Sequence, residues 1–435
     1  MNLNLVAAVG IIVLVILLLM GMNIGLSMMI VGFVGYLYVV TPSAALGLLR
    51  QVPATQAGSY NLAVIPIFIL MGNLAFSAGL SQGLYNAANK WLSRLPGGLA
   101  CATIAACAGF GAISGSVIAT AATMGVVSIP EMRKYGYADS LATGAISVGG
   151  TLGILIPPST PFIIYGILSE ASIGQLFAAG VFPGILLAAL CVVVVTIQVK
   201  RNPSLAPPCG KVTWKERFQS LRGLIGMAIL FAASIGGMFL GIFTVNEAAA
   251  VGAILALLLS VINKSFSWKR LYDILKDSVR TTAMAYLILL GAGVFGNFLA
   301  ITKMPMHLAS FISGLDVSRY VILAIIVLIY AFLGCIMDGL PMMMLTVPIF
   351  LPVIETLGFD AIWFGVMIVL VMELGAITPP VGMSCYVIAG VAKDVSLPTI
   401  FRGSLPYVPA ILIAIILITA FPGIALWLPG IVHAA

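Results

Sequence analysis

Charged side chains are scarce in this sequence of 435 residues: 8% are Asp, Glu, Lys or Arg, whereas 62% are hydrophobic. A soluble protein of this length needs far more charge to cover its surface. The apolar runs recur from end to end, and each is about as long as the ~20 residues that a helix needs to cross a bilayer. They are rich in Leu, Ala, Ile and Met and lack the two-residue alternation of strands. The sequence therefore predicts an all-α polytopic membrane protein without a sizeable soluble domain.

The motifs of several chemistries are absent as well. There is no GxxxxGKS phosphate loop, no HExxH motif and no Ser-His-Asp arrangement, and the two histidines, His307 and His433, lie in or near predicted loops. The six cysteines show no CxxC or other metal-ligand spacing. The first apolar run, 3–20, has no basic region before it and no cleavage site after it, so we take it as a retained span. We expect no enzymatic activity and no bound cofactor.

The net charge of +7 has a topological origin. Basic residues gather in two predicted loops, at 200–222 and at 264–280, as expected for loops on the cytoplasmic side. We favour this explanation over a nucleic-acid or lipid-specific site. The first loop contains Lys200, Arg201, Lys211, Lys215, Arg217 and Arg222.

Apolar runs and helix breakers divide the chain into two similar halves. Residues 1–200 are expected to hold spans at 3–20, 23–40, 59–79 and 176–199, a re-entrant hairpin at about 97–130 and a broken helix at about 138–168. A cytoplasmic basic linker, 201–222, follows. Residues 223–435 are expected to hold spans at 223–243, 247–263, 280–301 and 405–428, a hairpin at about 320–352 and a broken helix at about 363–391. Two segments that mix charged with apolar residues, 81–96 and 264–280, are predicted to be amphipathic helices along the membrane surface.

The two halves are predicted to be an internal duplication. The segment GILIPPS at 153–159 matches GAITPPV at 375–381, a shift of 222 positions, and the same shift relates Pro130 to Pro352. Each half is expected to contain five crossings, an odd number, so the second half enters the membrane from the opposite side. This pattern predicts an inverted repeat, a plan common among secondary transporters. With the basic linker in the cytoplasm, both chain ends lie outside.

The helix breaks and the hairpin tips are the predicted binding site. Irregular backbone at membrane depth is tolerated only within protein or beside a water-filled cavity. Two breaks related by inverted symmetry should meet near the midplane, where helix N-termini face an anion and freed carbonyls bind a cation. The first tip, AISGS at 112–116, adds hydroxyl groups, although small residues there also suit close helix packing.

Three carboxylates stand out in the second half. Asp338 lies at the second tip, where placing a charged carboxylate between apolar runs costs free energy. It either binds sodium, a hard cation that prefers oxygen ligands, or caps a helix. Glu373 precedes the second break by one turn and is either a proton or cation residue or a paired structural carboxylate. Glu247 follows Thr244 and is expected to cap the start of a helix.

Five segments together resemble the large membrane subunit of the tripartite ATP-independent periplasmic (TRAP) transporters: GAISGSVIATAATMG, IPEMRKYGY, GGTLGILIPPS, MDGLPMMMLTVPIFLPV and ELGAITPPVG. The resemblance spans nearly the whole chain. It implies an elevator-type, sodium-driven uptake system for organic acids, such as sialic acid, C4-dicarboxylates or other carboxylates, in the bacterial inner membrane. It also implies two partners, a separate small four-helix membrane subunit and a periplasmic substrate-binding protein, with Na⁺ as the coupling ion and no other cofactor. The paired amphipathic segments would be arms of a scaffold.

By position in the family's motifs, the resemblance assigns a sodium site to each hairpin tip and the broken helix beside it. The sodium-site residues are Ser114, Gly115, Ser116, Gly149, Gly150, Gly153, Asp338, Gly339, Gly375, Thr378 and Pro379. The substrate would lie between the tips, beside Thr120, Thr151, Pro157, Pro158, Ser159 and Pro380.

Two alternatives fit part of these features. A stand-alone dicarboxylate or anion symporter could use the same inverted-hairpin plan without a binding protein. An ion channel could use re-entrant hairpins, but two unlike hairpins in an inverted duplication argue against the symmetric central pore that channels usually need.

Overall fold

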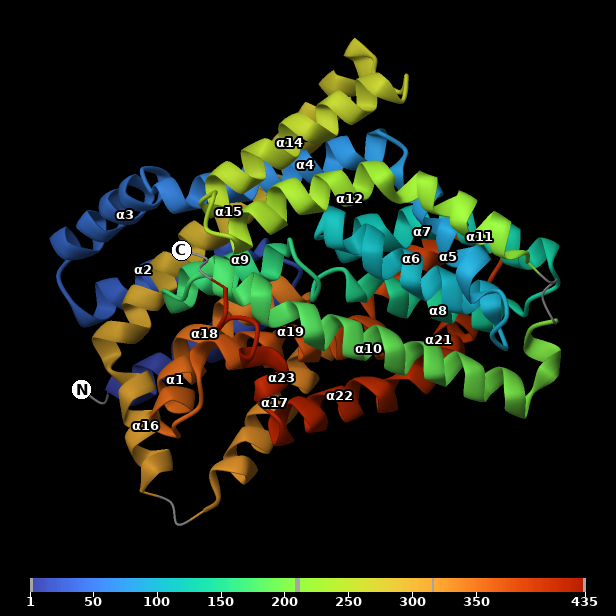
Figure 1. Ribbon diagram of the computed structural model, residues 1–435. Coiled ribbons are helices and arrows are strands. Elements are labelled where there is room, and N and C mark those ends of the chain that lie inside the picture. The colour runs from blue at the N-terminus through green and yellow to red at the C-terminus, as the bar shows by residue number, and fades with distance from the viewer. Residues whose placement is uncertain (1–2, 208–211, 315–316, 433–435) are drawn as a thin grey trace.

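The computed structural model describes residues 3–207, 212–314 and 317–432, and every regular element in these ranges is a helix (Figure 1). Within them, 7 helical segments, or 8 when a bent pair is taken as one span, are long and apolar enough to cross a membrane. The prediction of an all-α membrane protein is confirmed. Cys209, Lys211 and His433 lie outside the described residues.

The first helices follow the predicted spans. α1 (Leu3–Leu19), α2 (Ile24–Val39) and α4 (Val64–Ser77) lie within the first three of them. A helix that the sequence did not indicate, α3 (Pro42–Ala57), and the short turn η1 (Tyr60–Ala63) precede α4. The predicted amphipathic segment 81–96 forms α5 (Leu80–Leu92), whose axis is bent by 66° from that of α4.

Each predicted hairpin is a pair of helices that meet at a short turn. The first pair is α6 (Gly98–Ser114) and α7 (Val117–Lys134), and the second is α17 (Arg319–Ile336) and α18 (Gly339–Thr356). Each predicted broken helix also consists of two helices. These are α8 (Asp139–Leu152) with α9 (Thr160–Ser169), and α19 (Ala361–Ile377) with α20 (Met383–Val391). The helix ends fall at the tips and breaks that the sequence indicates.

A shift of 222 residues relates the bounds of these helices. Adding 222 to the bounds of α7, 117–134, gives 339–356, the bounds of α18. Adding 222 to 139, the first residue of α8, gives 361, the first residue of α19. A duplication requires such matching, because equal elements then recur at equal spacing. The opposite orientation of the two halves in the membrane stays a prediction.

Three segments differ from the expectation. The basic linker 201–222 is not a single loop, because α10 (Ile173–Arg201) reaches into it and a helical run, Trp214–Phe239, begins inside it. Residues 264–280 do not form a surface helix of their own; α15 (Trp268–Thr302) starts among them and continues without a break. No Pro interrupts α15, so the helix runs on for 35 residues. A short helix that the sequence did not indicate, α16 (Met304–Ser313), follows α15, and His307 lies near its start.

The other elements connect or cover these helices. The run from Trp214 comprises α11 (Trp214–Ser220), η3 (Leu221–Leu224), α12 (Ile225–Phe231), the π-helical η4 (Ala232–Gly236) and α13 (Gly237–Phe239). The remaining elements are η2 (Pro203–Leu205), α14 (Val245–Ile262), α21 (Leu397–Ser404), η5 (Leu405–Tyr407), α22 (Val408–Ala420) and α23 (Gly423–Leu426).

The broken helices lie within the protein core. α8 packs against both arms of the first hairpin, and α19 packs against both arms of the second. The short helices after the breaks cross over, since α9 contacts α18 and α20 contacts α7. All residues of α8 from Leu141 to Leu152 are buried, as expected for a helix that is covered on every side. A second group lies beside this core in Figure 1: α15 packs against α2 and α4, and α14 packs against α4.

Candidate ion and substrate site

The tip of the first hairpin gathers hydroxyl groups. Ser116 caps α7 by accepting from the Ala119 N–H at 3.3 Å, and the Ser114 Oγ lies 2.7 Å from the Thr120 Oγ1. Between the serines, Gly115 has a φ of +58°, a conformation that favours glycine. The tip therefore places three side-chain oxygens close to carbonyls of a sharp turn, the ligand types that a hard cation prefers.

This tip touches the first helix break. A Cβ atom added to Gly111 would lie 2.3 Å from the Gly153 Cα, and one added to Gly115 would lie 3.1 Å from the Pro158 carbonyl oxygen. The structure thus brings the predicted residues of tip and break together. Gly149 and Gly150 face the hairpin arms instead of the tip. A Cβ on Gly149 would lie 2.8 Å from Cys107 of α6, and one on Gly150 would lie 2.9 Å from Ala121 of α7. They let α8 approach both hairpin arms.

The first break is buried and uses its own hydroxyl groups. Ser159 caps α9, where its Oγ donates to the Ile154 carbonyl and accepts from the Phe162 N–H at 3.4 Å. The buried Thr151 Oγ1 donates to the Val148 carbonyl at 2.8 Å. The Pro157–Pro158 peptide bond is cis, and both prolines are buried. Two of the expected substrate residues therefore bond to the backbone at helix ends in this structure: Thr151 at the end of α8 and Ser159 at the start of α9.

The tip of the second hairpin carries a carboxylate that is free of a cap bond. Asp338 occupies the N-cap position of α18, yet its side chain makes no capping hydrogen bond and is exposed. Next to it, a Cβ on Gly339 would lie 2.5 Å from the Met372 Cε. The helix-cap alternative thus holds for the position of Asp338; its carboxylate interacts with the Gly339 N–H but does not cap α18, and the residue is exposed.

The second tip also touches its helix break. A Cβ added to Gly375 would lie 2.6 Å from the carbonyl of Gly334, and the Val381 N–H donates to the Cys335 carbonyl at 3.1 Å. In the break, the Thr378 Oγ1 donates to the Leu374 carbonyl at 2.5 Å. The peptide bond between Pro379 and Pro380 is cis, as in the first break, but these two prolines are exposed.

Glu373 is the most deeply buried carboxylate of the site. It is 0% exposed, and no partner in the described part of the chain lies in hydrogen-bond geometry to its carboxylate oxygens, but the Thr151 hydroxyl interacts with the carboxylate. Its position minus 222 is 151, so the shift relates it to Thr151. Both alternatives for Glu373, a proton or cation residue and a paired structural carboxylate, stay predictions. Glu247 behaves as expected: it forms a capping box with Thr244 at the start of α14.

An ion-pair network that the sequence did not reveal joins α7, α8 and the segment after α20. The Arg133 Nε lies 2.7 Å from Asp139 at the start of α8, and its Nη2 lies 2.7 Å from Asp394 after α20. Arg133 thereby lowers the pKa of Asp394, and the two acids raise that of Arg133. The only sign of this network in the sequence is a difference in charge between the halves: the shift of 222 relates Arg133 to Glu355.

Two hydrogen bonds connect the broken helices of the two halves. The Ser384 Oγ of α20 donates to the Ser147 carbonyl of α8 at 2.6 Å, and the Tyr165 hydroxyl of α9 donates to the Ala361 carbonyl of α19 at 2.5 Å. Together with the tip contacts, they join both hairpins and both breaks into one packed unit.

The chain is similar to known transport proteins over most of its length. A family model described as "Tripartite ATP-independent periplasmic transporter, DctM component" matches residues 11–424. The sialic acid TRAP transporter large permease protein SiaM of Vibrio cholerae is 34% identical over 414 residues, which cover 95% of this chain and 96% of that protein. The C4-dicarboxylate TRAP transporter large permease protein DctM of Pseudomonas aeruginosa is 33% identical over 374 residues, which cover 85% and 86%.

A solved structure of different sequence shares the fold. The Alcanivorax borkumensis YdaH transporter superimposes with a TM-score of 0.64 at 15% identity, covering 89% of this chain and 91% of that one. This likeness concerns the fold alone, and it agrees with a membrane-transporter architecture.

Proposed function

The chain belongs to the DctM family of TRAP transporters, and we propose that it is the large membrane subunit of a sodium-coupled system that imports small organic acids. A family of transport subunits agrees with the expectation that the chain is not an enzyme. The observation that carries the proposal is the pair of contacts between hairpin tips and helix breaks, Gly111 with Gly153 and Gly334 with Gly375.

Sodium is proposed to bind at each of these contacts. At the first, the hydroxyls of Ser114 and Ser116 and the carbonyls around Gly153 supply neutral oxygens. At the second, the exposed carboxylate of Asp338 supplies charged oxygens, and the carbonyls around Gly375 supply neutral ones. Oxygen ligands of this kind suit a hard cation such as sodium.

The organic acid is proposed to lie between the two tips. No Lys or Arg occurs in the tips or breaks, at 111–120, 149–160, 334–342 and 373–383. An anionic substrate would then depend on the N-termini of the helices that start at the breaks, and on the bound sodium ions. This neutral surrounding is consistent with selection by a separate binding protein, so sialic acid, C4-dicarboxylates and other carboxylates are all candidate substrates.

Movement is proposed to follow the elevator mechanism. The hairpins and broken helices form the packed unit described above, and α2, α4, α14 and α15 form a second group that would be the scaffold. The family implies a periplasmic substrate-binding protein and a small membrane subunit as partners. We place the chain in the bacterial inner membrane as an inverted repeat with both ends on the periplasmic side, because this orientation puts the basic residues at 200–222 in the cytoplasm.

Uptake into proteoliposomes tests the proposal. The vesicles would hold this chain and its small subunit, with the binding protein and radiolabelled candidate acids outside, under a sodium or a potassium gradient. We expect accumulation that requires sodium and the binding protein and that falls in Asp338→Ala. Glu355→Gln, an exposed carboxylate at the other end of α18, is the control and should transport normally. Accumulation without the binding protein would instead support the stand-alone symporter, and equilibration without accumulation would support a channel.

A further inference from the structure

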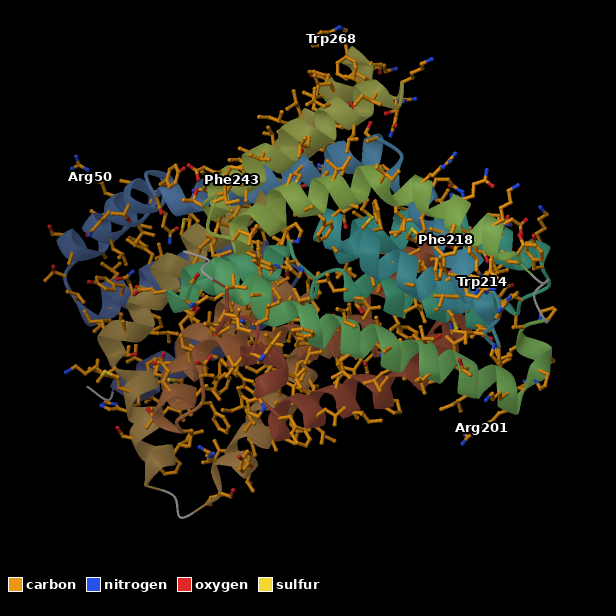
Figure 2. The ribbon with its side chains drawn as sticks, in the orientation of Figure 1. Arg50, Arg201, Trp214, Phe218, Phe243 and Trp268 are labelled. Atoms are coloured by element: carbon orange, nitrogen blue, oxygen red, sulfur yellow. The ribbon has the colours of Figure 1, made fainter. Side chains whose placement is uncertain are left out.

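Aromatic and basic side chains form a cluster where α11 meets α5. The Arg217 Cζ lies 5.0 Å and the Arg94 Cζ lies 5.6 Å from the centroid of the Trp214 ring. Phe218 stacks on Trp214 with centroids 6.4 Å apart, and it meets Trp91 of α5 edge-on at 5.9 Å. Figure 2 shows Trp214 and Phe218 close together on α11, on the opposite side of the view from Arg50.

Arg217 is buried in this cluster, and two of the three nitrogens of its guanidinium group lack an acceptor within the described part of the chain. The residue is 5% exposed, and its Nε and Nη2 have no hydrogen-bond partner among the residues that the structure describes. The adjacent Glu216 is engaged elsewhere, because it accepts from the Thr213 N–H and hydroxyl at 2.9 Å each and lies 3.8 Å from Lys90. A buried charged donor that lacks a partner is costly. An anion from outside the chain would satisfy it.

The charge of the cluster and its position indicate which anion fits. Lys90 lies beside Glu216, whereas Arg94 and Arg217 lie over the Trp214 ring, and the charges of these four residues sum to +2 (3 − 1). A guanidinium offers parallel N–H donors that match two oxygens of a phosphate group. Trp214 is 58% exposed and lies at the first residue of an apolar run long enough to cross the membrane. Aromatic rings at such positions lie at the level of lipid headgroups.

We propose that Arg217 and Arg94 bind the phosphate of an anionic phospholipid whose acyl chains cover Trp214 and Phe218. The leaflet is the one that the basic residues place on the cytoplasmic side. Membrane topology accounts for the number of basic residues here, as the sequence suggested, but it does not account for a buried, unpaired guanidinium. A soluble anion would leave the two exposed rings uncovered, whereas a lipid covers them. The lipid would join α5 to the helical run that starts at Trp214.

Native mass spectrometry of the delipidated full-length chain in detergent tests this site. Phosphatidylglycerol would be titrated in, with phosphatidylcholine as the zwitterionic comparison and inorganic phosphate as a competitor. Arg217→Gln and Arg94→Gln are the test variants. Arg222→Gln is the matched control, because Arg222 is exposed and makes no contact with the Trp214 ring in the structure, and its replacement changes the net charge equally. We expect each test variant to bind the first phosphatidylglycerol about tenfold more weakly, the effect of losing one charge-assisted contact.

The control should bind phosphatidylglycerol like the wild type, and phosphatidylcholine should bind more weakly than phosphatidylglycerol. If Arg217→Gln does not fold, Arg94→Gln, whose side chain is exposed, decides the question alone. Equal affinity in the wild type and the test variants overturns the proposal, and so does an equal loss in Arg222→Gln, which would indicate diffuse attraction. Displacement of the lipid by equimolar inorganic phosphate would assign the site to a free anion. If adding the small membrane subunit abolishes lipid binding, the partner of Arg217 would instead be a carboxylate of that subunit.

Discussion

Replacing Gly153 by alanine adds one Cβ atom at the contact between the first hairpin and the first broken helix. Gly153 has a φ of −67° and a ψ of −18°, so the backbone accepts an alanine and only the contact opposes it. The new atom would lie 2.3 Å from the Gly111 Cα, whereas ordinary contact starts at 3.4 Å, so tip and break must separate by about 1.1 Å (3.4 − 2.3). Overpacking of this kind costs about 1–3 kcal/mol.

Two measurements on purified protein read out this change. We expect Gly153→Ala to lower the midpoint of thermal unfolding by several degrees, and to lower sodium-dependent uptake at limiting sodium by at least about tenfold, because the ligands on tip and break no longer meet. Gly390→Ala is the control, since a Cβ on Gly390 in α20 meets nothing within 4 Å; it should transport normally. Wild-type uptake and wild-type stability in Gly153→Ala would refute the argument that tip and break form the site by direct backbone contact.

Three further changes test other parts of the molecule. Asp338→Asn removes a carboxylate without a cap bond; we expect the sodium concentration for half-maximal uptake to rise about tenfold or more, and an unchanged value contradicts a sodium ligand at this residue. Asp394→Asn removes one of the carboxylates that pair with Arg133. In the wild type, the bond to Arg133 lowers the pKa of Asp394 from 3.8. A carboxyl group whose pKa is lower in the folded than in the unfolded state stabilises the folded protein at a pH above its unfolded-state pKa. This stabilisation is lost as the pH falls through its folded-state pKa. The wild type should therefore unfold at a higher temperature than the variant at about pH 7 and at the same temperature at about pH 2, and a difference that persists in acid refutes the ion pair as its cause. Thr244→Ala removes the N-cap of α14 and should destabilise the protein by about 1 kcal/mol in denaturant unfolding, whereas Thr244→Ser, which keeps the hydroxyl, should match the wild type.

Much of the fold could be predicted from the sequence, because helix-breaking residues and the lengths of apolar runs determine local structure. The turn after Ser114 and the breaks before Thr160 and Met383 fall where Gly and Pro interrupt apolar runs. The continuous α15 and the added helices α3 and α16 were not indicated, because charged residues near membrane ends look alike in a loop and in a helix that extends beyond the bilayer.

The sequence indicated the neighbourhoods of the site better than the state of each side chain. Small residues can serve a ligand or close packing, and only the structure separates the two: Gly153 contacts the tip, whereas Gly149 faces an arm of the hairpin. The hydroxyl of Ser159 could point to a substrate, but it caps its own helix. Arg133 and Asp394 are 261 positions apart (394 − 133), so no local pattern could reveal their ion pair.

The residues that the shift of 222 superposes differ in charge, and this difference bears on how sodium and an acid would be coupled. Ser116 and Asp338 are both N-caps at a hairpin tip, and Thr151 corresponds to Glu373. In each pair the first half carries a hydroxyl group and the second half a carboxylate. A sodium ion held by neutral oxygens at the first tip would keep its positive charge available to a nearby acid, whereas Asp338 would neutralise an ion at the second. Because the tips and breaks contain no Lys or Arg, the first tip is then the place where bound sodium can supply the charge that an organic acid requires.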